Sequence, residues 1–415
     1  MCGLFLAGAR PSCACFGQLT VYRTITPGGS HTPVIATFVG SLITLVPVTV
    51  DGMRLFAAAA ALVLVLIACS SGSTLPGAGS SASTSMASVT ERDTSTQAIP
   101  SGTENWLKGQ LHMHTSFSPD SSTSPKDMIE RYEELGFDFI VITDHNQTTN
   151  LTEYDGEIRA YVGVELSQGL DACDPQPLGP EDKVGWCHIH VSSLFSDTVP
   201  PDGLPWGPFR SGSPLGLSEF LIITAQQLGG LTMINHPDQY GAVTGSLLVE
   251  QWLRGAALVE IANMSTKESV VPLGHPHPEE IWDEALSTGA YLLGVASDDA
   301  HRPSEAGFGW VMVRADNTEE SIRRALAAGD FYSSTGVVLS RLDVTATHLT
   351  IEVDGVELHT IDFIGRGGHV LWSTEGTSAA IELPADGYVR AVITASDDAK
   401  AWTQPASLPQ RAPSG

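Results

Sequence analysis

The sequence has 415 residues and a formal net charge of −26, and 42% of its residues are hydrophobic. This length accommodates a large domain with a smaller one, and the apolar content suffices for a buried core. The acidic excess argues against a general binder of duplex nucleic acid, because such binding relies on Lys and Arg displacing counterions. A local pocket for a small anion remains compatible with this charge.

The first hundred residues have the composition of a leader and a tether. Residues 53–69 comprise Arg54, an apolar run and Cys69, the pattern of a secretory signal peptide. The ending "LIAC" resembles a bacterial lipobox, which implies cleavage before Cys69 and lipid attachment to its thiol. A transmembrane or buried helix is the alternative, although the apolar run is about five residues short of the roughly 20 that span a bilayer.

The segments on either side of this signal complete the prediction of an exported, membrane-anchored lipoprotein of the cell envelope. Residues 70–103 are rich in Ser, Thr and Gly, which predicts an unfolded tether. Residues 1–52 precede a signal that works best at an N-terminus, so we expect them to be a non-native extension, with a two-segment anchor as the alternative. Export permits a disulfide between Cys173 and Cys187, which are otherwise two unlinked thiols.

From residue 104 onward, short apolar runs alternate with amphipathic runs. The predicted strands are 110–114, 137–146, 160–167, 186–195, 231–237, 257–264 and 290–301. The predicted helices are 124–136, 217–230, 246–255, 278–289 and 317–329. Such alternation predicts an α/β fold with parallel strands, and seven strands with crossover helices favour a barrel over residues 104–338. Short alternating strands with Gly and Asp turns predict a small β domain over residues 339–405.

Nearly all potential metal ligands lie at the carboxyl ends of these strands, and His190 lies within the fourth strand. Nine residues are candidates: His112, His114, Asp120, His145, Glu165, His190, His236, Asp299 and His301. Residues two apart on a strand share a face, and the carboxyl ends of barrel strands converge on one mouth. His188 competes with His190 for one position. The remaining histidines of the folded part are not assigned to the site: His275, His277, His348, His359 and His369.

The chemistry of these candidates indicates a centre with more than one ion. Imidazole nitrogen and carboxylate oxygen suit zinc, manganese or iron. Nine ligands exceed the needs of one tetrahedral ion, so we expect two to three divalent ions, with Glu165 able to bridge two of them. Clustered ions acidify a bridging water, so that hydroxide is available near neutral pH.

The ordered motifs "HMHTSFSPD", "ITDHN", "GVELS", "HIHVSSL", "NHP" and "SDDAH" resemble those of the polymerase and histidinol phosphatase (PHP) family over about residues 107–336. The closest similarity is to stand-alone phosphoesterases and to an exported branch that includes a carbaryl hydrolase. The resemblance implies a distorted seven-stranded β/α barrel, a trinuclear metal centre and hydrolysis by metal-bound hydroxide.

The resemblance also implies how the ligands divide. His112 and His114 would hold one ion with Glu165 and Asp299. Glu165 would bridge to a second ion, held by His190 and His236. The third ion would be held by Asp120, His145 and His301.

Four further points concern individual positions. The family often has aspartate directly after the serine, whereas Pro119 here precedes Asp120. Asp144 is expected to orient His145. Asp298 is an alternative ligand to its neighbour Asp299. Arg302 is expected to meet a substrate anion, with an ordinary surface arginine as the alternative. Together with the ligand assignments above, these points give four residues with expected catalytic roles: Glu165, Asp299, Asp144 and Arg302.

The function expected from these features is metal-dependent hydrolysis of small phosphate esters. The alternatives are hydrolysis of a carbamate, ester or amide by the same centre, or 5′–3′ exonuclease-type activity on short nucleic acid. A non-enzymatic lipoprotein that binds metal or glycans is the alternative from another class. The sequence does not name the substrate or the oligomeric state.

Overall fold

A computed structural model describes residues 106–151, 154, 156–170, 187–200, 209–210, 212–239, 242–265 and 276–407, together with three short strands near the N-terminus. Those three strands, β1 (Gln18–Val21), β2 (Val34–Val39) and β3 (Leu42–Leu45), form an antiparallel sheet of their own. The predicted signal peptide and tether, and Cys173 of the predicted disulfide, lie outside the described residues. No helix among the described residues is both long and apolar enough to span a membrane.

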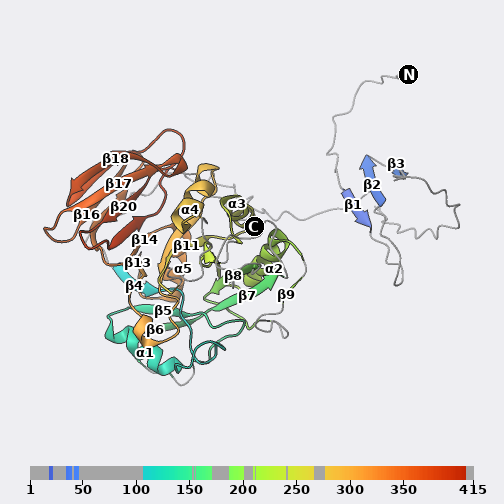
Figure 1. The fold of residues 1–415 in the computed structure, drawn as a ribbon, viewed down its shortest axis with the longest axis horizontal. Helices are drawn as coiled ribbons and strands as arrows, with labels where there is room; N and C mark the ends of the chain where they lie inside the picture. Colours follow the sequence, from blue (N-terminus) through green and yellow to red (C-terminus); the bar gives the residue numbers. More distant parts are fainter. Residues whose placement is uncertain are drawn as a thin grey trace, which may run out of the picture. The chain divides into compact units, whose positions relative to one another are not determined.

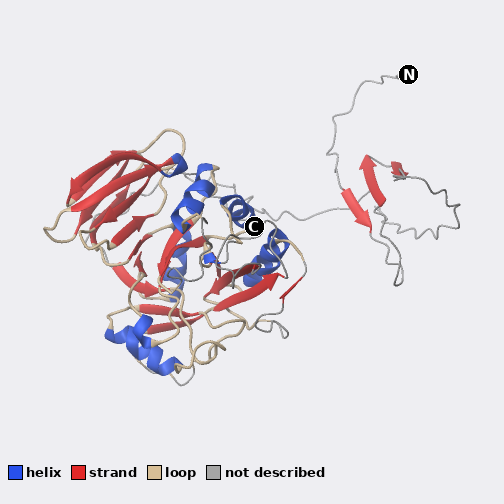
Figure 2. Cartoon of the chain, viewed as in Figure 1, coloured by secondary structure: helices blue, strands red, loops and turns tan. Residues whose placement is uncertain are grey.

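The folded part from Trp106 onward is a mixed α/β structure, which confirms the predicted class (Figures 1 and 2). Its first half contains β4 (Trp106–Gln110), α1 (Pro125–Glu134), β5 (Phe139–Ile142), β6 (Arg159–Val162), β7 (Val164–Leu170), β8 (Cys187–Leu194), β9 (Phe209–Arg210), α2 (Pro214–Gln227), β10 (Leu231–Ile234), α3 (Gly245–Leu253), β11 (Leu258–Asn263), α4 (Pro278–Ser287) and β12 (Leu293–Ser297). Six of the seven predicted strands and the first four predicted helices are therefore present. The prediction of a strand over 110–114 is wrong: β4 ends at Gln110, and beyond it Met113 makes only an isolated bridge with Ala300, so His112 and His114 follow the strand instead of lying on it. The helices begin where the sequence provides caps: the Ser124 hydroxyl, for example, accepts a hydrogen bond from the amide of Asp127, and Pro125 follows it.

The second half begins after β12. It contains β13 (Trp310–Arg314), α5 (Glu319–Ala328), β14 (Phe331–Ser334), β15 (Leu339–Val344), β16 (His348–Val353), β17 (His359–Gly365), β18 (His369–Gly376), β19 (Ser378–Glu382), β20 (Arg390–Thr394) and β21 (Lys400–Thr403). The short β-strands predicted after residue 339 are present as β15 to β21. The ladder also continues across that point, because β21 pairs with β14, which pairs through β13 with β4.

Two large sheets carry the candidate site. One has the order β12-β11-β10-β8-β7-β9, and the other has the order β18-β17-β20-β21-β14-β13-β4-β5-β6. The expectation of parallel strands throughout is wrong at β8, which pairs antiparallel with both β7 and β10. The chain passes from one sheet to the other at Gly163, between β6 and β7. A side chain there would press on the Ser193 carbonyl oxygen at 3.0 Å and on the side chain of Val141 at 2.9 Å.

No continuous ladder among the described strands closes these sheets into one barrel. Two isolated parallel bridges connect them instead, Met113 with Ala300 and His145 with Glu165. Both bridges lie beside candidate metal ligands. The two sheets therefore meet beside β7 and the segments that follow β4, β5 and β12, where the sequence placed the site.

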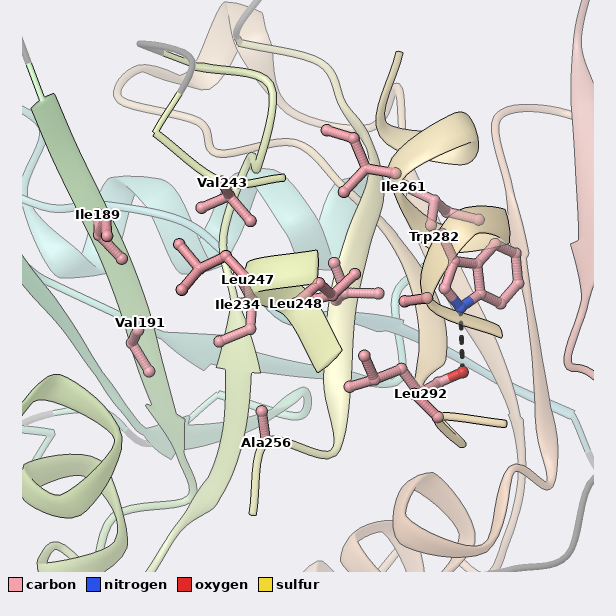
Figure 3. Close-up of a cluster of buried hydrophobic side chains, with 14 of the residues drawn as sticks. Ile189, Val191, Ile234, Val243, Leu247, Leu248, Ala256, Ile261, Trp282 and Leu292 are labelled. Carbon is pink, nitrogen blue, oxygen red and sulfur yellow. Dashed lines mark hydrogen bonds between the residues drawn. The ribbon is translucent and has the colours of Figure 1, made fainter. Parts of the chain in front are cut away.

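A large apolar core lies between the six-stranded sheet and helices α2, α3 and α4. Val191, Ile234 and Ile261 from the strands pack against Leu248 of α3 and Trp282 of α4 (Figure 3). The Trp282 indole N–H donates to the carbonyl oxygen of Leu292, so its buried polar group is satisfied (Figure 3). This packing fixes β8, β10 and β11, the strands that carry or precede several candidate ligands.

Candidate metal centre

All nine predicted ligands come together in one place. The structure contains four overlapping groups whose ligand atoms lie within 4.8 Å of one another. They are His114–Asp120–His145–His301, His112–Glu165–His236, His112–His114–Asp299 and His145–Glu165–His190. Multiple overlapping groups indicate a polynuclear site rather than a site for one ion.

Glu165 lies at the middle of these groups. Its carboxylate is fully buried on β7, and its Oε1 atom is 3.0 Å from His190 Nδ1 and 3.1 Å from His236 Nε2. Its Oε2 atom is 2.8 Å from His145 Nδ1 but receives no hydrogen bond among the described residues. A buried carboxylate oxygen without a donor is costly unless a cation completes its environment. This orphaned oxygen fits the binding of a metal ion.

A second carboxylate, Asp299, faces the paired histidines that follow β4. Its Oδ1 atom lies 3.0 Å from His114 Nε2 and 3.3 Å from His112 Nε2. Such separations of about 3 Å are those of donors sharing one ion at ligand distances near 2.1 Å. The backbone of Asp299 has a φ of +51°, which few residues other than glycine adopt. Its amide is held by the carbonyl oxygen of His112 at 2.9 Å, so the strained backbone aims the carboxylate at the site.

Asp120 forms the outer edge of the centre. Its Oδ2 atom is 3.2 Å from His145 Nε2 and 3.1 Å from His301 Nε2, so the inserted Pro119 does not remove it from the site. The Asp120 side chain is 36% exposed and that of His301 is 22% exposed, whereas that of Glu165 is 1% exposed. The group that contains Asp120 is therefore the part of the centre open to solvent.

Burial and mutual charge shift the pKa of these groups in opposite directions. Burial alone would lower the pKa of His145, but the carboxylates of Glu165 and Asp120 raise it to about 9. Burial likewise opposes ionisation of Asp299, yet the neighbouring histidines hold its pKa well below the ordinary value. For His190, burial dominates and lowers the pKa to about 3, which leaves the ring neutral and able to ligate a metal.

The two acidic neighbours of the predicted ligands have other partners. The Asp144 carboxylate accepts hydrogen bonds from the amide and hydroxyl of Thr115 and from the hydroxyl of Thr149. It thereby fixes the turn that follows His114. Asp298 points away from the histidines and accepts bonds from the amides of residues 307–309, from Tyr132 and from Gln110. Of the two adjacent aspartates, Asp299 is the one that reaches the site.

Two further candidates lie at the margin of the site. The Arg302 side chain is 71% exposed and its Nε atom pairs with Glu305 at 2.5 Å. His188 has its ring centroid 6.1 Å from that of His190 and belongs to none of the four groups. Of the two histidines on β8, His190 is the one placed among the candidate ligands.

Sequence reasoning missed one carboxylate beside the site. Glu260 is fully buried in the middle of β11, and its Oε1 atom lies 2.7 Å from His112 Nδ1. A signal for it was available, because a lone Glu within the apolar run "ALVEIAN" is a charge expected to be buried. Asn235 was also missed: its amide nitrogen donates to Glu165 Oε1 at 2.8 Å.

Comparisons with known proteins give a family match over part of the chain. The PHP domain family matches residues 110–181, which contain His112, His114, Asp120, His145 and Glu165. A comparison with curated protein sequences gave no match. A solved two-domain protein from Bacteroides vulgatus ATCC 8482, described as containing a predicted PHP-like metal-dependent phosphoesterase, is 16% identical. That match covers 74% of this chain and 97% of the other, with a TM-score of 0.39. The segment 110–181 is thus similar to the PHP domain, and the remaining candidate ligands lie beyond it in the same cluster.

Proposed function

We propose that this protein is a metal-dependent phosphoesterase of the PHP type that acts on small phosphate esters. The observation that carries the proposal is the buried Glu165 carboxylate, placed between imidazoles from four different parts of the chain. Five of the nine ligand candidates lie within the segment that matches the PHP domain, and the other four complete the same groups.

The residues of the chain would divide the work as follows. His112, His114, Glu165 and Asp299 would hold the most buried ion, and His190 and His236 would hold a second beside Glu165. Asp120, His145 and His301 would hold a third ion at the solvent side, where a substrate approaches. When bound, two or three ions of manganese, zinc or iron would polarise the phosphoryl group and supply a water of lowered pKa.

Two structural points belong to the same proposal. We infer that the two sheets act as the distorted seven-stranded barrel of this family, with the isolated bridges at Met113 and His145 in place of full ladders. The pattern at residues 53–69 supports export and lipid attachment at Cys69. Such an anchor would place the centre at a membrane surface, outside the cytoplasm.

A reconstitution experiment tests the proposed activity. The purified protein would be stripped with a chelator, reloaded with manganese, zinc or iron, and assayed on 4-nitrophenyl phosphate, a phosphodiester and an aryl carbamate. We expect turnover of a phosphate ester by the reloaded protein and none by the stripped protein. Turnover of the carbamate alone would transfer the proposal to the carbamate hydrolases. Full metal loading without turnover of any substrate would favour a binding protein.

A further inference from the structure

The carboxylate of Glu260 is surrounded by hydrogen-bond donors on both of its oxygens. Oε1 accepts from His112 Nδ1 at 2.7 Å and from the hydroxyl of Ser297. Oε2 accepts from the backbone amide of His236 at 2.6 Å and from the side-chain amide of Asn263 at 3.0 Å. Every one of these groups is buried. A fully buried charge with four donors is an organised site rather than an accidental burial.

The partners of Glu260 include two of the candidate metal ligands. His112 directs its Nε2 atom toward Glu165 and Asp299, at 3.5 Å and 3.3 Å, while its Nδ1 atom faces Glu260. His236 has a φ of +23°, an unfavourable backbone conformation for histidine, and its amide is fixed by Glu260. Asn263, the fourth partner, also donates to Asp299 Oδ2 at 3.2 Å.

We propose that Glu260 is a positioning residue of the metal centre, which holds His112 with its proton on Nδ1 and orients the backbone of His236. With the proton on Nδ1, the lone pair of His112 Nε2 is directed at the ions, which is how carboxylates tune metal-bound histidines. The inference rests on the proposed metal centre. It adds that the proposed centre depends on a residue that belongs to none of the four ligand groups.

The substitution Glu260→Gln tests whether both acceptor oxygens of Glu260 are required. Glutamine has one oxygen that accepts and one NH₂ group that donates, whereas all four partners of Glu260 donate. If the NH₂ group faces the amide of His236, two donors meet and the backbone is released. If it faces His112, the ring must move its proton to Nε2 in order to accept, and Nε2 can then hold no metal. The first orientation weakens the group that contains His236, and the second weakens both groups that contain His112.

The test is a zinc titration of the full-length protein, with a competing chelator, for wild type and Glu260→Gln. His112 belongs to the groups His112–Glu165–His236 and His112–His114–Asp299. It does not belong to the groups His114–Asp120–His145–His301 and His145–Glu165–His190. We therefore expect the zinc affinity at one or both of the groups that contain His112 to fall by roughly 10- to 100-fold, with that of the group His114–Asp120–His145–His301 unchanged. Equal affinities in wild type and variant at every site would overturn the inference and leave the proposed function standing. A wild-type protein that binds no zinc would overturn both.

Two further measurements distinguish a specific loss of zinc affinity from a general loss of folding. Asp283→Asn removes a buried carboxylate from the α4–β20 contact, away from the centre, and should lose stability without losing zinc affinity. In zinc-loaded wild type with ¹⁵N-labelled histidine, long-range ¹H–¹⁵N spectra should show His112 with a proton on Nδ1 and none on Nε2. A proton on Nε2 would contradict the proposed role even if Glu260→Gln could not be purified.

Discussion

Glu165 and His236 are 71 residues apart in the sequence, yet Glu165 Oε1 and His236 Nε2 lie 3.1 Å apart and both side chains are buried. They come from different elements, strand β7 and the turn after β10. Had they been on opposite faces of the fold, the prediction of one metal centre would have failed. Their contact makes Glu165 the residue on which the proposed chemistry depends most.

Replacing Glu165 with Gln should weaken metal binding and lower activity. An amide oxygen cannot offset the charge of two divalent cations, so the ions beside Glu165 should bind more weakly. A loss of about 2–3 kcal/mol of transition-state stabilisation corresponds to roughly 30- to 200-fold in rate. The measurement is the rate on the best substrate together with metal content by mass spectrometry.

His188→Ala is the matched control for that variant, because His188 lies on β8 but outside the four groups. It should keep its metal and most of its rate. A metal-replete, fully active Glu165→Gln protein would contradict the bridged centre. Loss of metal in His188→Ala with retention in His190→Ala would show that the wrong histidine of β8 was chosen.

The ion held by Asp120 should be the easiest to remove, because Asp120 and His301 are the most exposed members of the centre. Asp120→Asn should lower the binding affinity of one ion by about tenfold or more and leave the affinity of the others unchanged. Asp127→Asn, a change in the exposed first turn of α1, should alter none of them. The measurement is the metal content that remains as the chelator concentration is raised in steps. An equal loss of affinity for every ion would contradict a separate outer group.

Metal affinity should rise with pH between about 7 and 9. In the metal-free protein the pKa of His145 is raised to about 9, so its ring is protonated at pH 7, whereas only the neutral ring binds metal. Binding at pH 7 must therefore expel a proton, and each unit of pH gained should strengthen binding at this group by up to about tenfold. Calorimetry in buffers of different ionisation enthalpy counts the proton; pH-independent binding without proton release would refute the assignment.

The contact between α4 and β20 should contribute to stability but not to metal binding. Arg390 is buried and pairs with Asp283 through its Nε and Nη2 atoms, at 2.8 Å and 2.6 Å, and Tyr388 donates to the same carboxylate. Removing the charge of Asp283 leaves the buried Arg390 with the longer contact to Glu279, at 3.4 Å, and loss of a partner from a buried pair typically costs about 3–5 kcal/mol. Urea unfolding of Asp283→Asn should show this loss, with metal content equal to wild type. A variant as stable as wild type would contradict the role given to this pair.

Much of the fold and the site could be predicted because both depend on local patterns. Apolar runs ended by polar ligands located six of the seven predicted strands, and Ser124 with Pro125 located the start of α1. The antiparallel direction of β8 could not be predicted, since periodicity shows which face is buried but not how strands pair. Strands β13 and β14 were missed, and their place in the sheet depends on long-range pairing with β4 and β21.

The sequence also could not predict which of two neighbouring polar residues reaches the site. Asp298 and Asp299 are adjacent acids, and only the turn of the backbone at Asp299 decides which of them reaches the histidines. Glu260 was overlooked because it lies in the middle of β11, whereas the sequence motifs pointed to residues near strand ends. Its role follows from contacts with residues far away in the sequence, His112 and Ser297.

Anomalous diffraction from crystals of the protein loaded with manganese or zinc tests the central claim most directly. The account predicts two or three metal peaks beside Glu165, separated by roughly 3.5–4 Å, with Asp120 and His301 at the outermost peak. A single peak remote from Glu165, or no peak in a protein otherwise folded as described, would contradict the polynuclear centre.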